Sequence, residues 1–278
     1  MKRIAMFTGS RSEFGLLKNL AKILQSKRNI KFDLIISGSH LSKLYGKTIS
    51  EILKYNIKIF KKIKLPLEKN DRNKNVNYLI NQFSNYLNKF KPDTIILLGD
   101  RFETFAVACA SVLSKIRIVH IHGGEITKGS RDDLYRHSIS KMSDFHFVST
   151  SKSAKRLVKM GEDKMKIFNY GAMCNDSINQ LKKLSKAKVE NLLGTKFSKK
   201  NILISYHPET YSKKKNINDL KILFRSLYGI DNTKFIFSAP NFDENSHVTL
   251  KMIKEFCRKN KNALYIDSLG HELFLNTL

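Results

Sequence analysis

The feature that most constrains the fold of this chain is a strand–helix–strand pattern at residues 94–137. An apolar run at 94–98 ends in Gly-Asp-Arg at 99–101, and apolar residues then recur at helical spacing. A second apolar run at 116–121 ends in His-Gly-Gly-Glu at 122–125. Ligands of open parallel sheets bind at the carboxyl ends of the strands. Because polar residues gather at both strand ends, the pattern indicates a functional site at this edge.

The same alternation of strand and helix patterns runs along the chain. Further apolar runs predict strands at 3–8, 31–37, 57–65, 145–149 and 166–169, and then at 201–206, 234–238 and 263–267. A charged, polar stretch at 68–75 is expected to be a loop before a helix at 76–89. Strands that alternate with helices of this length predict an α/β fold with doubly wound parallel sheets.

A break in the alternation separates two domains. We predict a first domain at 1–171, a helical, lysine-rich connection at 172–195 and a second domain at 196–278. The second domain has three clear strands, and its last helix is still apolar where it stops. Because a parallel sheet is covered on both faces, this second domain is expected to be incomplete.

Composition limits the classes of function. The formal net charge of +27 alone would favour nucleic-acid binding. However, the lysines are spread over many predicted helices and loops, so we interpret them as a solvated surface and expect no nucleic-acid partner. No apolar run approaches the roughly 20 residues of a membrane span, so no membrane segment is expected. The three cysteines lie far apart, which fits a reducing cytoplasm and argues against a structural zinc site.

The first strand ends in Gly-Ser-Arg-Ser at residues 9–12, where a helix pattern begins. Backbone N–H groups at a helix start favour anions, and Arg11 can bind a phosphate group with its guanidinium fork. A tight turn with a surface arginine is the alternative. The full G-x-G-x-x-G pattern is absent, so neither a nicotinamide nor a flavin cofactor is expected.

The central unit offers further candidates. Asp100 suits acid–base chemistry or a helix N-cap, and Arg101 beside it suits phosphate binding or tuning of that carboxylate. His120 and His122 stand two residues apart on a strand pattern, hence on one face, where they could bind a metal or make structural hydrogen bonds. Glu125 could act as an acid, a base or an acceptor for a sugar hydroxyl.

Three more groups follow at helix and strand ends. On one predicted helix, the acids at 132–133 lie about one turn from the bases at 136–137, so each acid has a basic neighbour. His207 ends the first strand of the second domain, and histidine is the usual acid or base near neutral pH. Asn241 and Asp243 follow the next strand and could bind a sugar or a base edge.

Taken together, these motifs resemble the hydrolysing UDP-N-acetylglucosamine 2-epimerases of bacterial sialic and legionaminic acid synthesis. The motifs that carry the resemblance are TGSRSEFG (8–15), LGDRFE (98–103), HIHGGE (120–125), DDLYRHSISKMS (132–143), YHPET (206–210) and PNFD (240–243). The resemblance implies two Rossmann-like domains of GT-B-like arrangement with a UDP-sugar between them. It also implies elimination of UDP from the sugar, followed by hydration with inversion at C2.

The resemblance also implies roles for individual residues. Asp100 and Asp132 would be the acid–base carboxylates, His207 would be a further catalytic or phosphate-facing group, and either His122 or Glu125 would supply the second base. Substrate or UDP contacts would come from Arg11, Arg101, Arg136, His137, Asn241 and Asp243. No cofactor and no obligatory metal are implied, because the proton chemistry needs only side chains of suitable pKa.

Family members continue well past residue 278, with segments that grip the diphosphate, so the resemblance marks this chain as C-terminally truncated. Weak UDP-sugar binding and little activity are therefore expected. Two alternatives remain: a glycosyltransferase-like protein on the same fold, and a basic binding protein without catalysis. The residues leave open whether the substrate is UDP-GlcNAc or a diacetamido-sugar nucleotide. They also leave open whether the chain forms a homo-oligomer.

Overall fold

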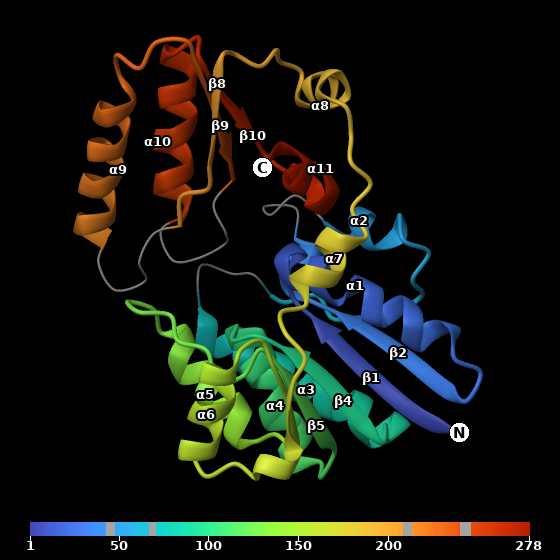
Figure 1. Cartoon of the computed structure of the whole chain (residues 1–278). Coiled ribbons are helices and arrows are strands. Elements are labelled where there is room, and N and C mark those ends of the chain that lie inside the picture. The colour runs from blue at the N-terminus through green and yellow to red at the C-terminus, as the bar shows by residue number, and fades with distance from the viewer. Residues whose placement is uncertain (43–47, 67–70, 208–212, 240–245) are drawn as a thin grey trace. The chain divides into compact units, whose positions relative to one another are not determined.

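The computed structural model describes the chain except for residues 43–47, 67–70, 208–212 and 240–245 (Figure 1). Contacts between residues divide it into two compact units, Met1–Asn179 and Gln180–Leu278, which are described separately. The division falls inside the predicted connection at 172–195. None of the described helices combines the length and the apolar character that a membrane span requires.

Unit 1 is built on a seven-stranded parallel sheet in the order β3-β2-β1-β4-β5-β6-β7. Its strands are β1 (Lys2–Thr8), β2 (Ile30–Ile36), β3 (Ile59–Lys62), β4 (Thr94–Leu98), β5 (Arg117–Ile121), β6 (Phe145–Val148) and β7 (Ile167–Asn169). Its α-helices are α1 (Arg11–Ser26), α2 (Ile49–Leu53), α3 (Arg72–Phe90), α4 (Phe102–Leu113), α5 (Asp132–Lys141), α6 (Ser151–Lys159) and α7 (Cys174–Asn179), and short 3₁₀ turns cover Gly38–Leu41 and Lys164–Lys166.

This strand order confirms the predicted doubly wound sheet. The chain runs outward from β1 to β3, then returns to place β4 beside β1 and continues outward to β7. The order therefore reverses between β1 and β4. Doubly wound folds bind ligands at the carboxyl ends of the strands at such a reversal point. The loops at residues 9–10 and 99–101 flank this position.

Two apolar layers cover the two faces of the sheet. On one face, α3, α4 and α5 pack on β-strand residues that include Phe7 and Leu97, and fully buried Phe83 and Ala106 lie within this layer. On the other face, α1 and α2 pack on alternate residues of the same strands. This alternation is the reason that the strands read as continuous apolar runs in the sequence.

Helix α3 begins earlier than the sequence predicted. The segment 68–75 was expected to be a loop, whereas the helix starts at Arg72. Asp71 caps it, because the Asp71 side chain accepts a hydrogen bond from the Lys74 N–H at 3.1 Å. The first turn therefore gains its stability from a polar cap, which an apolar periodicity cannot reveal.

Unit 2 is built on a three-stranded parallel sheet in the order β10-β9-β8. Its elements are α8 (Lys186–Leu193), β8 (Lys200–Ile204), α9 (Lys213–Leu227), β9 (Thr233–Ser238), α10 (Ser246–Lys259), β10 (Ala263–Ile266) and α11 (Gly270–Thr277). Helices α9 and α10 pack on one face of the sheet, and α8 and α11 pack on the other. The three predicted strands are confirmed, whereas the predicted helical connection is split into α7 and α8.

A buried ion pair ties β1 to β2 in unit 1. Arg3 Nε donates to Asp33 Oδ2 at 2.6 Å, and the Tyr86 hydroxyl donates to the same oxygen at 2.7 Å. The Asp33 side chain is only 1% exposed. The Arg3 guanidinium also lies 4.7 Å from the ring centroid of Phe90. Because the Asp33 carboxylate is buried away from water, removing its charge would leave the buried Arg3 cation without a compensating charge.

We therefore expect Asp33→Asn to lower the free energy of unfolding of unit 1 by about 3 kcal/mol. Lys2→Ala is the matched control, because Lys2 lies next to Arg3 in β1 and its ion pair with Asp93 is exposed. That variant should change the free energy by less than about 1 kcal/mol. Native-state hydrogen exchange of the β1 and β2 amides measures both values. Equal effects of the two substitutions would contradict the prediction.

Candidate active site

The structure brings most of the sequence-predicted site residues to one edge of unit 1. Eight of them lie in the loops, or in the first two helical turns, that follow β1, β4 or β5: Arg11, Asp100, Arg101, His122, Glu125, Asp132, Arg136 and His137. His207 belongs to unit 2, where it is exposed just past β8. Asn241 and Asp243 lie outside the described residues. The described part of the candidate site is therefore the carboxyl edge of β1, β4 and β5.

Arg136 is the buried centre of this edge. Its side chain is only 5% exposed. Nη2 donates to Asp100 Oδ2 and, at 3.0 Å, to the Thr127 hydroxyl. Nη1 donates to Asp133 Oδ1 at 2.5 Å and to the Glu125 carbonyl oxygen at 3.1 Å. One guanidinium thus joins the segment after β4, the segment after β5 and helix α5.

These contacts use the donors of Arg136 almost fully. An arginine has five N–H donors, and each terminal nitrogen carries two of them. Both terminal nitrogens of Arg136 have two protein acceptors each. The sequence predicted that Arg136 contacts the substrate or UDP. A ligand that binds these nitrogens would have to share their N–H groups with the protein acceptors or displace one of them. That contact stays a prediction.

Helix α5 carries the acids and bases that the sequence placed one turn apart. Of the two acids on this helix, Asp133 pairs with Arg136, and Asp133 Oδ1 also accepts from the Thr127 N–H at 2.8 Å. Asp132 is half-buried at the start of the helix, where its N–H donates to the Ser130 hydroxyl. Burial lowers the pKa of His137, and the Asp133 carboxylate opposes this shift.

His122 and Glu125 form a second titratable pair at the end of β5. His122 Nδ1 lies 3.5 Å from Glu125 Oε1, and that oxygen accepts from the Ser149 hydroxyl at 2.5 Å. His122 Nε2 accepts from the Met173 N–H at 3.2 Å, so the neutral ring carries its proton on Nδ1, toward Glu125. The pKa of His122 is lowered by burial, and the Glu125 carboxylate opposes this shift only in part.

The expected pairing of His120 with His122 on one strand face is wrong. Strand β5 ends at Ile121, and His122 has a left-handed φ of 65°, which turns it away from the strand. His120 is buried, with Nε2 against the Gly99 carbonyl oxygen and Nδ1 against the Ser140 hydroxyl. Among the described residues, no group of three or more His, Cys, Asp or Glu side chains is placed to hold a metal ion.

The loop between β1 and α1 places Arg11 at the reversal point of the sheet. Ser10 caps α1, and Glu13 completes a capping box with it. Glu13 Oε2 accepts from the Gly9 N–H at 2.6 Å and from the Ser10 N–H at 3.1 Å. Arg11 is the first residue of this helix, directly after the loop whose N–H groups Glu13 accepts from. Its role in phosphate binding stays a prediction.

Glu13 is a site-edge residue that the sequence reasoning did not single out. Burial raises its pKa to about 7, the Glu103 carboxylate adds to the rise, and Arg101 opposes it. Arg101 forms two contacts with Glu103, at 3.2 and 3.4 Å, so this predicted UDP contact is also paired within the protein. The Ser-x-x-Glu spacing of the capping box was the available signal for Glu13, although it could not reveal the burial.

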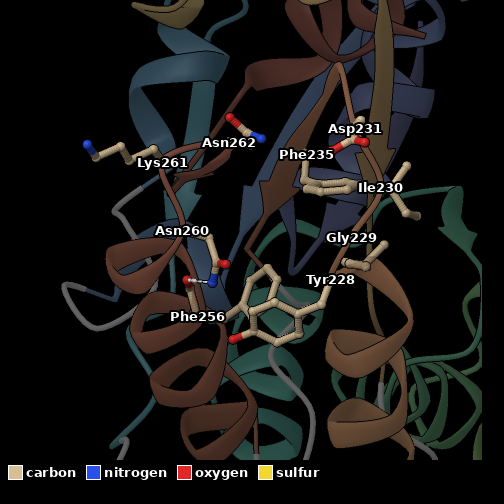
Figure 2. A pocket seen from close by; sticks show the side chains of 10 residues that line it. Tyr228, Gly229, Ile230, Asp231, Phe235, Phe256, Asn260, Lys261 and Asn262 are labelled. Carbon is tan, nitrogen blue, oxygen red and sulfur yellow. Dashed lines mark hydrogen bonds between the residues drawn. The ribbon is translucent and has the colours of Figure 1, made fainter.

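Unit 2 has a pocket of about 360 Å³ whose lining includes none of the predicted site residues. Figure 2 shows it between the carboxyl ends of α9 and α10, with the rings of Tyr228, Phe235 and Phe256 among its lining side chains. Asn260 Nδ2 donates to the Phe256 carbonyl oxygen at 2.7 Å beside it. The pocket lies at the amino end of β9, whereas His207 follows the carboxyl end of β8. It is therefore not the predicted site.

Comparisons with known proteins agree with the resemblance seen in the motifs. A family profile described as UDP-N-acetylglucosamine 2-epimerase matches residues 22–278. The chain is 36% identical over 281 residues to the Campylobacter jejuni protein named GDP/UDP-N,N'-diacetylbacillosamine 2-epimerase (hydrolyzing). This match covers 100% of this chain and 73% of the relative. It is 33% identical to a UDP-N,N'-diacetylbacillosamine 2-epimerase (hydrolyzing) of Legionella pneumophila, over 92% of this chain and 68% of the relative.

A solved structure has the same fold. The crystal structure of the UDP-GlcNAc 2-epimerase from Neisseria meningitidis bound to UDP-GlcNAc matches with a TM-score of 0.80 and 18% identity. The match covers 99% of this chain and 74% of that chain. This likeness confirms the predicted fold class of two Rossmann-like parallel sheets.

The raised pKa of Glu13 predicts a dependence of stability on pH. As the pH rises from the ordinary pKa of 4.5 to about 7, the folded protein holds a proton that the unfolded chain has released. Stability is therefore lost through this window. From about pH 5 to about pH 8, the free energy of unfolding should fall by roughly 2–3 kcal/mol more in the wild type than in Glu13→Gln.

Urea unfolding of both proteins at the two pH values, followed by circular dichroism, measures this difference. Glu255→Gln is the control, because Glu255 is an exposed carboxylate beside Lys259. The control should change the pH dependence far less. Parallel pH profiles for the wild type and Glu13→Gln would show that Glu13 is ionised in the folded protein.

Proposed function

Because the chain belongs to the UDP-N-acetylglucosamine 2-epimerase family, we propose that it is a hydrolysing 2-epimerase of a UDP-activated 2-acetamido sugar. The names of the Campylobacter and Legionella relatives support a diacetamido sugar, UDP-N,N'-diacetylbacillosamine, as the preferred substrate. UDP-GlcNAc is the simpler substrate of the same chemistry. The product would be the free 2-epimeric sugar together with UDP.

The observation that carries this proposal is the cluster around Arg136. The carboxylate of Asp100, the His122–Glu125 pair and the first turn of α5 meet at one sheet edge, joined by one guanidinium. Acid–base chemistry at a sugar carbon needs titratable groups at fixed positions. The Arg136 guanidinium contacts the Asp100 carboxylate directly and so fixes its position at this edge.

In the proposed reaction, a base removes the proton from C2 while the bond between C1 and the UDP oxygen breaks, which forms a C1–C2 double bond. Water then adds to C1 and gives up one proton to a base, while an acid returns a proton to C2 on the opposite face. Two groups of opposite role are therefore required. We assign them to Asp100 and to the His122–Glu125 pair, with Asp132 as the further carboxylate at the start of α5.

Binding of the UDP group is assigned to the remaining predicted residues. Arg11 stands at the start of α1, where helix N–H groups favour a diphosphate. Arg101, His137, His207, Asn241 and Asp243 complete the proposed contacts to substrate and UDP. Free Cys109, Cys174 and Cys257 support a cytoplasmic setting. The product would supply an aldol-type synthesis of a sialic or legionaminic acid.

The test is incubation with each nucleotide sugar in deuterated water, followed by NMR. We expect UDP and a free manno-configured sugar that carries deuterium at C2, because the returning proton comes from solvent. Asp100→Asn should lower kcat by about 100-fold or more with a smaller change in KM. The Asp163→Asn variant changes an exposed carboxylate in the turn before the amino end of β7 and should keep wild-type turnover.

Two results would contradict the proposal. Transfer of the sugar to an added acceptor with retained C2 configuration would indicate a glycosyltransferase. No UDP release from either nucleotide sugar, with binding of nucleic acid that weakens steeply with salt, would indicate a basic binding protein.

A further inference from the structure

We propose that His120 is a positioning residue that fixes Asp100 for the reaction, acting through the backbone of Gly99. The inference rests on the proposed function, because it assigns to His120 the alignment of a proposed acid–base carboxylate. His120 itself lies beneath the site edge and is fully buried. It therefore has no direct access to substrate.

Both ring nitrogens of His120 are bound within the protein. Nε2 lies 2.8 Å from the Gly99 carbonyl oxygen, and Nδ1 lies 3.0 Å from the Ser140 hydroxyl. A carbonyl oxygen only accepts, so Nε2 carries the proton and Nδ1 accepts from Ser140. Burial lowers the pKa of His120 to about 4, so the ring is neutral at ordinary pH. The imidazole is thus a fixed bridge rather than a proton carrier.

Both backbone polar groups of Gly99, which directly follows β4, are hydrogen-bonded. Its N–H donates to the Ile121 carbonyl oxygen at 3.0 Å, and its own carbonyl oxygen accepts from His120. Gly99 has a φ of 79°, which favours glycine, although no described atom would lie within 4 Å of an added Cβ. The turn that aims Asp100 therefore depends on these two hydrogen bonds and on the backbone conformation.

The His120–Ser140 bond is itself enclosed by the loop after β5. A Cβ added to Gly123 would lie 2.8 Å from the Ser140 hydroxyl and 2.9 Å from His120 Nδ1, closer than side chains approach. Ser140 lies on α5, one turn beyond Arg136. His120 therefore contacts the three segments that carry the proposed catalytic groups: the end of β4, the loop after β5 and helix α5.

The structure offers a matched control on the neighbouring strand. His146 lies opposite His120 in the register of β5 and β6, and it is equally buried. Its Nε2 contacts Glu162 at 3.1 Å instead of a site segment. A His→Leu substitution at either position removes a buried imidazole, but only the one at His120 releases Gly99.

The experiment compares His120→Leu, His120→Gln, Ser140→Ala and His146→Leu in the full chain. We expect His120→Leu to lower kcat for UDP release by about 100-fold, with KM within about threefold, because misplacement of a reacting group acts on turnover. His120→Gln keeps an N–H donor toward Gly99 and should recover about tenfold of that loss. His146→Leu should stay within about threefold of wild-type kcat.

Hydrogen exchange of the Gly99 amide provides a readout that needs no turnover. It should accelerate by about tenfold or more in His120→Leu, less in His120→Gln and Ser140→Ala, and remain unchanged in His146→Leu. An unchanged Gly99 amide in His120→Leu would overturn the proposal, and so would an equal loss of kcat in His146→Leu. If His120→Leu does not fold, His120→Gln and Ser140→Ala decide by the same two readouts. If the wild type releases no UDP, the proposed function fails, and Gly99 exchange still decides the role of His120.

Discussion

The interaction on which the site edge depends is the one between the buried guanidinium of Arg136 and the carboxylates of Asp100 and Asp133. Burial lowers the pKa of Arg136 to about 10, with a further contribution from the nearby Arg156. A buried cation is expensive unless it is paired and hydrogen-bonded. The protein meets this need with acceptors from separate segments, so neutralising the cation also orders the loops. Local stability and the geometry of the proposed chemistry therefore have the same physical origin.

Around this pair, the structure combines rigid and titratable parts. The strand order brings the ends of β1, β4 and β5 together, and the apolar layers on both faces hold the sheet in place. His120, the Glu13 capping box and Arg136 then fix the three loops at their bases. His122 and Glu125 remain as a partly exposed titratable pair above them. This arrangement is what a proton-transfer site requires: fixed supports below and groups with adjustable protonation at the surface.

The fold was predictable from the sequence because parallel strands buried on both faces appear as apolar runs that alternate with helical periodicity. The start of α3 was not, since it depends on the Asp71 cap rather than on apolar spacing. Among the site residues, position at a strand end identified Asp100, His122 and Glu125. Tertiary contacts decided the rest: Asp133 rather than Asp132 is the described partner of Arg136, and the burial of Glu13 and His120 depends on segments far away in the chain. Spacing in a sequence shows which residues can come into contact, but not which of them become buried.

The most direct test of the account is the effect of Arg136→Lys on turnover and on UDP affinity, measured side by side. Lysine keeps the positive charge but cannot join Asp100, Asp133 and the loop after β5 in one plane. We predict that the rate of UDP release falls by about 100-fold, while the Kd for UDP, measured by calorimetry, stays within about threefold of the wild type. A UDP affinity weakened by about tenfold or more at nearly unchanged turnover would contradict this role and favour the UDP contact that the motif resemblance implies for Arg136.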